Sequence, residues 1–179
     1  MSLYRWNVEL VNNSDTDTLR SIYFFRKQVC IEEGWIAPAD YEEGISDKHD
    51  TCSIHFIVRD AGKIIGAARI AVVSALNEYV AAKSFDLVQI PKEYNPIAVF
   101  SRNMTAHSHR GEHVAGSVIN ARENFARENK FPLFLVITHD FLVDKYKAEG
   151  FTDIGAGDDS GLTFMKTHGN RVLIKVNKD

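Results

Sequence analysis

Hydrophobic and polar residues follow two different periods along the chain, and each period predicts one type of element. In residues 4–10 every second residue is apolar, which is typical of a half-buried strand. The polar run 12–15 then offers side chains that cap a helix N-terminus. From residue 19 to residue 30 the apolar positions recur at helical spacing, and Gly34 stands where a helix stop is expected. The chain is therefore predicted to begin with a strand followed by a helix.

The remaining pattern predicts a mixed α/β domain. Residues 53–59 and 63–73 are rich in β-branched and aromatic side chains, and the short connection between them indicates a hairpin. Residues 36–50 are acidic and have no clear period, so we expect a loop that lies over a binding cleft. The later predicted elements are a strand at 97–106, a helix at 115–127, a strand at 131–138, a helix at 139–149, and strands near 162–166 and 171–176. Strands and helices mixed along one chain, with no repeat or linker, predict a single domain over residues 1–179.

Composition narrows the class of protein. The 179 residues are 45% hydrophobic and 25% charged, which is the balance of a globular domain. The net charge of -3 gives no overall positive field for nucleic acid. Cys30 and Cys52 have no metal-binding or disulfide-framework spacing, which favours a reducing compartment. No signal peptide or membrane-spanning run is visible, so we expect a cytoplasmic protein without a membrane partner.

The first segment with candidate chemistry is residues 102–115. A predicted strand here runs into a loop that contains Gly111 and opens a helix. Such a loop turns several backbone N–H groups toward one point at the positive end of the helix dipole, where a diphosphate is stabilised. The alternative is an ordinary strand–turn–helix connection with a glycine in the turn.

The second segment is the tyrosine at 146 followed by the Gly150–Phe151 pair. On its own it is equally consistent with a packed aromatic ring and a glycine helix cap. In this order and separation, the two segments resemble the GNAT superfamily, whose diphosphate loop reads R-x-x-G-x-G/A and whose later motif reads Y-x-x-x-G-F. The chain departs from the family pattern at His113, where glycine is preferred, and at His139, where many acetyltransferases have asparagine.

The resemblance implies a fold, a donor and a set of residues. The implied fold is a mixed α/β GNAT fold with a central, mostly antiparallel sheet flanked by helices. The implied donor is acetyl-CoA or a longer acyl-CoA, or the phosphopantetheine of an acyl carrier protein, bound along the strand at Met104 and Thr105. The backbone of the loop would hold the phosphates, and the residues concerned are Arg110, Gly111, Glu112, His113, Val114 and Ala115. Tyr146 would act as the general acid that protonates the departing thiolate.

A third set of residues resembles one branch of the superfamily, the acyl-homoserine-lactone (autoinducer) synthases and the related N-acyl amino acid synthases. Its members are Arg26, Trp35, Asp47, Asp50, Arg69, Ser101 and Arg102. The chain departs from this branch at Val99, where a catalytic glutamate is expected, and at Cys30, where an aromatic residue is expected. Arg26 with Asp47 and Asp50 would form charge-assisted links that pin the acidic loop over the site. Two interpretations stay open: these charges pin the acidic loop to the domain, or they contact the acceptor substrate directly.

Other residues are interpreted more simply. His107, His109 and His113 have a spacing that zinc sites use, but the run crosses a strand end and the loop, so no metal is expected. The aromatic residues Tyr23, Phe24, Phe25 and Phe56 are expected in the core.

The sequence therefore predicts an N-acyltransferase that acts on a small-molecule amine. Its general base stays open between Glu32, Glu33, His107 and a water relay. Two alternatives remain: a non-catalytic acyl-CoA-binding regulatory module, and a protein N-acetyltransferase whose acidic loop attracts lysine-rich substrates.

Overall fold

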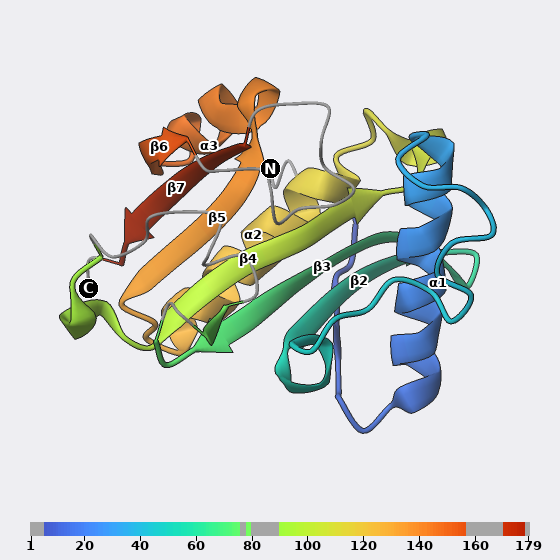
Figure 1. Ribbon diagram of the computed structural model, residues 1–179, viewed down its shortest axis with the longest axis horizontal. Coiled ribbons are helices and arrows are strands. Elements are labelled where there is room, and N and C mark those ends of the chain that lie inside the picture. The colour runs from blue at the N-terminus through green and yellow to red at the C-terminus, as the bar shows by residue number, and fades with distance from the viewer. Residues whose placement is uncertain (1–5, 76–77, 80–89, 157–169, 178–179) are drawn as a thin grey trace. The chain divides into compact units, whose positions relative to one another are not determined.

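A computed structural model describes residues 6–75, 78–79, 90–156 and 170–177. Its strands form one seven-stranded sheet in the order β1-β2-β3-β4-β5-β7-β6, in which β4 and β5 are parallel (Figure 1). The strands are β1 (Glu9–Val11), β2 (Ile54–Asp60), β3 (Lys63–Val73), β4 (Ile97–Thr105), β5 (Leu133–His139), β6 (Thr152–Ala156) and β7 (Asn170–Val176). The α-helices are α1 (Thr16–Glu32), α2 (Val114–Glu128) and α3 (Val143–Ala148). Short 3-10 helices cover η1 (Asp50–Cys52), η5 (Lys92–Tyr94), η6 (His107–His109) and η7 (Asp140–Leu142). The predicted mixed α/β class with a mostly antiparallel sheet is confirmed.

The chain divides into two compact units. The first unit comprises Met1–Ala71 and Ser101–Phe125, and the second comprises Val72–Phe100 and Ala126–Asp179. Among the described residues, no helix is long and apolar enough to cross a membrane.

In the first unit, the β2–β3 hairpin is covered by a helix on each face. Ile57 of β2 packs with Leu19 and Ile22 of α1 in one buried cluster. The neighbouring residue, Phe56, meets Phe125 of α2 with ring centroids 5.7 Å apart. Because successive strand residues point to opposite faces, α1 and α2 must lie on opposite sides of this hairpin.

Gly66 allows α2 to approach the sheet closely. A Cβ atom at this position would lie 2.5 Å from Cγ1 of Val114. Gly66 of β3 pairs with Val58 of β2. The hairpin therefore has a residue without a side chain at the point where α2 begins. The start of α2 is therefore held near the strand pair.

Local signals explain the bounds of α1. The Asp15 side chain accepts a hydrogen bond from the Thr18 amide at 3.0 Å and caps the N-terminus. At the other end Gly34 takes a positive φ of 70° and its amide donates to the Ile31 carbonyl. The following loop returns to the helix, because Gly44 approaches the backbone of Tyr23 and the Ile45 amide donates to the Tyr23 carbonyl at 3.0 Å.

The second unit has an aromatic core. Phe100 stacks on Phe134 with centroids 5.4 Å apart, and Phe151 meets the edge of Phe100 at 6.4 Å. The Tyr146 ring of α3 packs against Phe151 at 5.4 Å and is 4% exposed. The parallel register of β4 and β5 runs from the Ile97–Leu133 pair to the Phe100–Val136 pair.

The predicted element order is largely right, with two differences. Residues 139–149 do not form one helix: His139 ends β5 opposite Asn170, residues 140–142 form η7, and α3 follows. Strand β6 was not predicted, because its half-buried positions are Asp153 and Gly155 whereas Ile154 is exposed, so its sequence shows no apolar alternation. The predicted strand near residues 162–166 lies outside the described residues.

Candidate functional site

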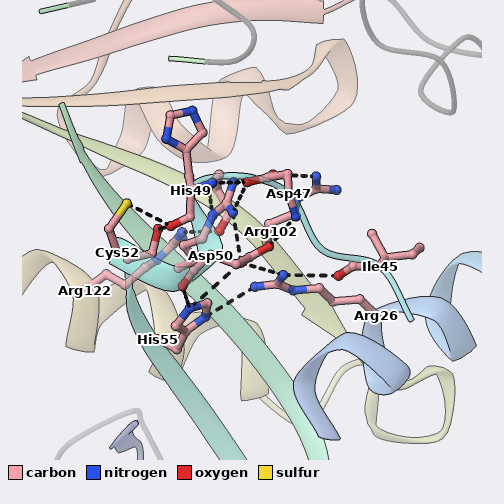
Figure 2. A network of polar contacts seen from close by, with 12 residues as sticks. Arg26, Ile45, Asp47, His49, Asp50, Cys52, His55, Arg102 and Arg122 are labelled. Carbon is pink, nitrogen blue, oxygen red and sulfur yellow. Dashed lines mark hydrogen bonds and ion pairs between the residues drawn. The ribbon is translucent and has the colours of Figure 1, made fainter. Parts of the chain in front are cut away.

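Two aspartates of the loop after α1 are held by arginines from three other elements of the first unit (Figure 2). Asp50 forms an ion pair with Arg26 of α1 at 2.8 Å and with Arg69 of β3 at 2.9 Å. Arg69 also donates hydrogen bonds to both carboxylate oxygens of Asp47, at 2.7 and 2.9 Å. Such bidentate, charge-assisted contacts are among the stronger hydrogen bonds in proteins.

Strand β4 supplies the third arginine. Arg102 donates to Asp47 Oδ2 at 2.9 Å, and Ser101 Oγ accepts from Arg69 Nε at 3.1 Å. Arg102 has a positive φ of 56°, so the strand backbone is locally distorted where this side chain leaves it. We call Arg26, Asp47, Asp50, His55, Arg69, Ser101 and Arg102 the arginine–aspartate network.

The loop's own backbone holds the two carboxylates in place. The Asp47 amide donates to Asp50 Oδ2 at 2.8 Å, and the His49 amide donates to Asp47 Oδ1 at 2.9 Å. The hydroxyl of Ser53 closes the turn by donating to the His49 carbonyl at 2.6 Å. Each carboxylate is therefore oriented by its own loop before it meets an arginine.

His55 of β2 is the remaining member of the network. Its Nε2 lies 2.8 Å from the Asp50 carbonyl oxygen, and its Nδ1 lies 3.3 Å from Nη2 of Arg26. A carbonyl only accepts and a guanidinium only donates, so the ring must carry its proton on Nε2. His55 is thus held as a neutral imidazole between a donor and an acceptor.

Burial and the neighbouring charges determine the protonation states. Burial opposes ionisation of Asp47, but Arg69 and Arg102 outweigh it and hold the pKa of Asp47 well below its usual range. The same balance, with Arg26 and Arg69, lowers the pKa of Asp50. Burial lowers the pKa of Arg26 to about 10, which still leaves it charged at neutral pH. Burial, aided by Arg26, also lowers the pKa of His55. Three cations therefore face two anions.

The loop before α2 presents a row of backbone amides. Within the described residues, the N–H groups of Gly111, His113, Val114 and Ala115 donate to no protein acceptor. Gly111 and His113 have positive φ values of 83° and 65°, the left-handed conformation that occurs in anion-binding backbone nests. This arrangement, at the positive end of a 15-residue helix, suits a phosphate group.

Three residues of the first unit, Trp6, Asp60 and Glu33, contact this loop from outside. Trp6 Nε1 donates to the Glu112 carbonyl at 2.8 Å, and the Trp6 ring meets the edge of His109. His109 Nε2 lies 3.4 Å from Asp60, and Arg110 forms an ion pair with Glu33. Because a trans peptide is planar, a Glu112 carbonyl directed at Trp6 leaves the His113 N–H pointing the opposite way.

The structure brings six of the seven predicted branch residues into the network. The exception, Trp35, lies beyond the end of α1, where its amide donates to the Cys30 carbonyl at 2.9 Å. The strand residues Met104 and Thr105 are half-buried at the end of β4. Tyr146 belongs to the second unit. Val99, which stands in place of the expected glutamate, is fully buried in the β4–β5 pair.

Sequence reasoning missed two participants. His55 is buried at a position that alternation assigns to the core face of β2, and a polar residue there is a signal for a partner. Trp6 was interpreted only as an apolar strand position, although it lies before β1 and contacts the loop before α2. That contact joins residues 106 positions apart, so no local pattern reveals it.

A family model for the acetyltransferase (GNAT) domain matches residues 25–119, more than half of the chain. The chain belongs to this GNAT acetyltransferase family. The match covers the arginine–aspartate network and the loop before α2, and it confirms the resemblance drawn from the sequence. No curated protein sequence matches the chain.

Solved structures of low sequence identity share the fold of this GNAT protein. The acyl-homoserine lactone synthase BjaI, solved with SAM and isopentyl-CoA, has a TM-score of 0.72 at 12% identity, with 93% of this chain and 81% of BjaI covered. The synthase LasI has a TM-score of 0.71 at 16% identity, covering 96% and 89%. An acyl-CoA N-acyltransferase from Pseudomonas aeruginosa has a TM-score of 0.66 at 11% identity, covering 96% and 99%.

The histidines of the loop do not gather around a common point in the described structure. His107 and His113 are exposed, and His109 lies between Trp6 and Asp60. Among the described residues, no group of three or more histidine, cysteine or acidic side chains is arranged to hold a metal ion.

Replacing Asp50 with Asn is expected to destabilise the fold strongly, because Arg26 and Arg69 would keep their charges in a buried site. We expect the free energy of unfolding, measured with urea, to fall by about 3–5 kcal/mol. Glu43→Gln is the matched control, since the Glu43–Arg20 pair is 3.7 Å long with side chains 88% and 67% exposed. If both variants were equally stable, the buried charges would not hold the loop.

Acid should destabilise the protein through His55. Its folded-state pKa is depressed, so below about pH 6.5 the unfolded chain binds a proton that the folded chain does not. The free energy of unfolding should therefore decrease from about pH 7 to about pH 5, by at most about 1.4 kcal/mol per pH unit for this group. His55→Gln keeps a donor and an acceptor but does not titrate, so urea titrations should show a shallower decrease. His49, whose pKa burial also lowers, leaves a residual slope. An unchanged slope in His55→Gln would contradict this prediction.

Proposed function

We propose that this GNAT protein is an N-acyltransferase that moves an acyl group from a CoA or acyl-carrier thioester to the amine of a small molecule. The row of amides at Gly111, His113, Val114 and Ala115 carries the proposal, because it suits the diphosphate of such a donor. Family membership supports the same chemistry. Met104 and Thr105 would hydrogen-bond the pantetheine arm through their backbone.

Transfer would occur directly between donor and acceptor in one complex. The amine nitrogen attacks the thioester carbon, the C–N bond forms, and the tetrahedral intermediate collapses with cleavage of the C–S bond. The departing thiolate takes a proton from the phenol of Tyr146, which would act as the general acid. The amine must lose one proton in exchange.

Two of the candidate bases are already engaged in the described chain. Glu33 forms an ion pair with Arg110, and Glu32 accepts a hydrogen bond from Gln28 at 2.9 Å. Asp47 and Asp50 are also bound by arginines, which makes them poor proton acceptors. We therefore propose that the acceptor amine binds in its neutral form or loses its proton to His107 or to water.

The arginine–aspartate network is proposed to shape the acceptor side of the site, together with Trp35. Arg69 and Arg26 are buried, whereas the side chain of Arg102 is 16% exposed and can reach a ligand. The similarity to BjaI and LasI favours an acceptor and an acyl chain like those of the autoinducer synthases.

A non-catalytic acyl-CoA-binding module is the second candidate. The specific observation in its favour is Val99, an apolar and fully buried residue at the position of the expected glutamate. Such a module would bind the thioester without cleaving it in the presence of any amine.

Donor binding tests the proposal. Calorimetric and thermal-shift titrations with acetyl-CoA, octanoyl-CoA and hexadecanoyl-CoA should show binding, and an affinity that rises with chain length would indicate a long acyl site. Ala115→Pro removes one amide in the first helical turn, where proline is tolerated, and should weaken binding by about 10-fold through the loss of one hydrogen bond to a charged group. Ala115→Val keeps the amide and should bind normally. Equal donor affinities of the two variants would show that the Ala115 amide does not bind the donor.

Turnover tests the role of Tyr146. With a panel of amines, chromatography should show thioester cleavage, and Tyr146→Phe should lower its rate by about 100-fold while donor affinity stays unchanged. Tyr94→Phe, at a half-buried tyrosine of η5, is the matched control. Unchanged turnover in Tyr146→Phe would exclude this tyrosine as the acid. Binding without cleavage of any thioester would favour the second candidate.

A further inference from the structure

A groove lies on the first unit between α1 and the β2–β3 hairpin, on a face of α1 that the arginine–aspartate network does not use. It has a volume of about 550 Å3. Helix α1 lines it with Ser21, Phe24, Phe25, Lys27, Gln28 and Ile31, and the hairpin lines it with Arg59, Gly62, Lys63 and Ile64. The helix residues recur every three or four positions, so they form one stripe along α1.

The floor of the groove is apolar. Phe24 is 40% exposed, so the expectation that it lies in the core is wrong, whereas Phe56 is buried as predicted. Phe25 and Ile64 are only partly buried and pack on the Leu19–Ile22 cluster from outside. An exposed aromatic ring beside the half-buried side chains of Phe25 and Ile64 forms an apolar patch that suits an apolar ligand.

The rim of the groove is cationic. Its lining contains Lys27, Arg59 and Lys63 and no carboxylate, although the whole chain has a net charge of -3. Arg59 forms an ion pair with Glu9 at 3.4 Å and donates a hydrogen bond to the Gly62 carbonyl. In the described part of the chain, Lys27 and Lys63 form no ion pair.

The acidic groups nearby have other partners. Asp60 contacts His109, Glu32 accepts a hydrogen bond from Gln28, and Glu43 pairs with Arg20 at the surface. The two lysine ammonium groups are therefore available to an anion from outside the chain. Their methylene stems add to the apolar surface below.

We propose that this groove binds an amphiphilic organic anion, with its aliphatic chain on Phe24, Phe25, Ile31 and Ile64 and its carboxylate between Lys27 and Lys63. A volume of about 550 Å3 matches a small-molecule ligand rather than a partner protein, since small-molecule sites span about 300–1,000 Å3. This inference is independent of the proposed acyltransferase activity, because it involves no donor, acceptor or turnover.

Titration of the full chain with octanoate tests the proposal. Calorimetry should show saturable binding at one site, and amide NMR signals of α1 and the hairpin should shift together. The neutral analogue 1-octanol and the short anion acetate should each bind at least about 10-fold more weakly, because 1-octanol lacks the negative charge and acetate lacks the aliphatic chain. Comparable binding of 1-octanol would overturn the role of charge.

Variants locate the site. The double variant Lys27→Gln with Lys63→Gln should weaken octanoate binding by about 10-fold, whereas Lys145→Gln, at an exposed lysine of the second unit, should leave it unchanged. Ser21→Glu places a carboxylate at an exposed helix position of the groove and should weaken binding, while Ser21→Gln, of the same size, should not. Octanoate affinity unaffected by the double lysine variant and by Ser21→Glu would overturn the proposal.

Discussion

Asp47 and Asp50 are held by Arg26, Arg69 and Arg102, and the arrangement of the first unit around residues 44–53 depends on these contacts. This segment has little regular structure of its own beyond the three residues of η1. Its position is therefore determined by charges that reach it from α1, β3 and β4. The buried carboxylate of Asp50 would be costly alone, and the buried guanidinium groups of Arg26 and Arg69 would be costly without it, so removing either partner destabilises the site.

The same interaction limits the chemistry available near it. A carboxylate held by two guanidinium groups has a depressed pKa and accepts a proton poorly, so the network supplies orientation and positive charge rather than a base. With His55 neutral, three cations and two anions leave a net positive charge. Any ligand that meets Arg102 would enter a cationic environment.

Helix α1 serves two surfaces with two sets of residues. One face buries Ile22, Arg26 and Val29 against the sheet and the loop. A second stripe, which includes Phe24 and Lys27, lines the groove beside the hairpin.

The loop before α2 offers backbone groups and not side chains to a ligand. The position of its amides depends on the backbone angles of the loop. His113 adopts φ of 65°, so a histidine takes the left-handed conformation where the family prefers glycine.

The sequence by itself determined the fold class, most element types and the family. Period-two and helical hydrophobic patterns reflect which face of each element is buried, and this is a local property that a sequence displays. The predictions failed where the local pattern did not reflect burial. The half-buried positions of β6 are Asp153 and Gly155, and His139 pairs with Asn170 as the last residue of β5 although a helix was predicted to begin there. The resemblance to the autoinducer synthases also indicated that Arg26 pairs with Asp47 and Asp50. The Arg26–Asp50 pair is confirmed, whereas Asp47 pairs with Arg69 and Arg102 instead.

Tertiary structure alone decided which charges meet. Asp47 contacts Arg69 and Arg102 rather than Arg26, His55 fits between Arg26 and a loop carbonyl, and Trp6 reaches Glu112. Phe24 has the same hydrophobicity as Phe56, yet one lines an open groove and the other fills the core. Burial and ion pairing depend on distances between elements far apart in the chain, and those distances follow from packing that no local pattern encodes.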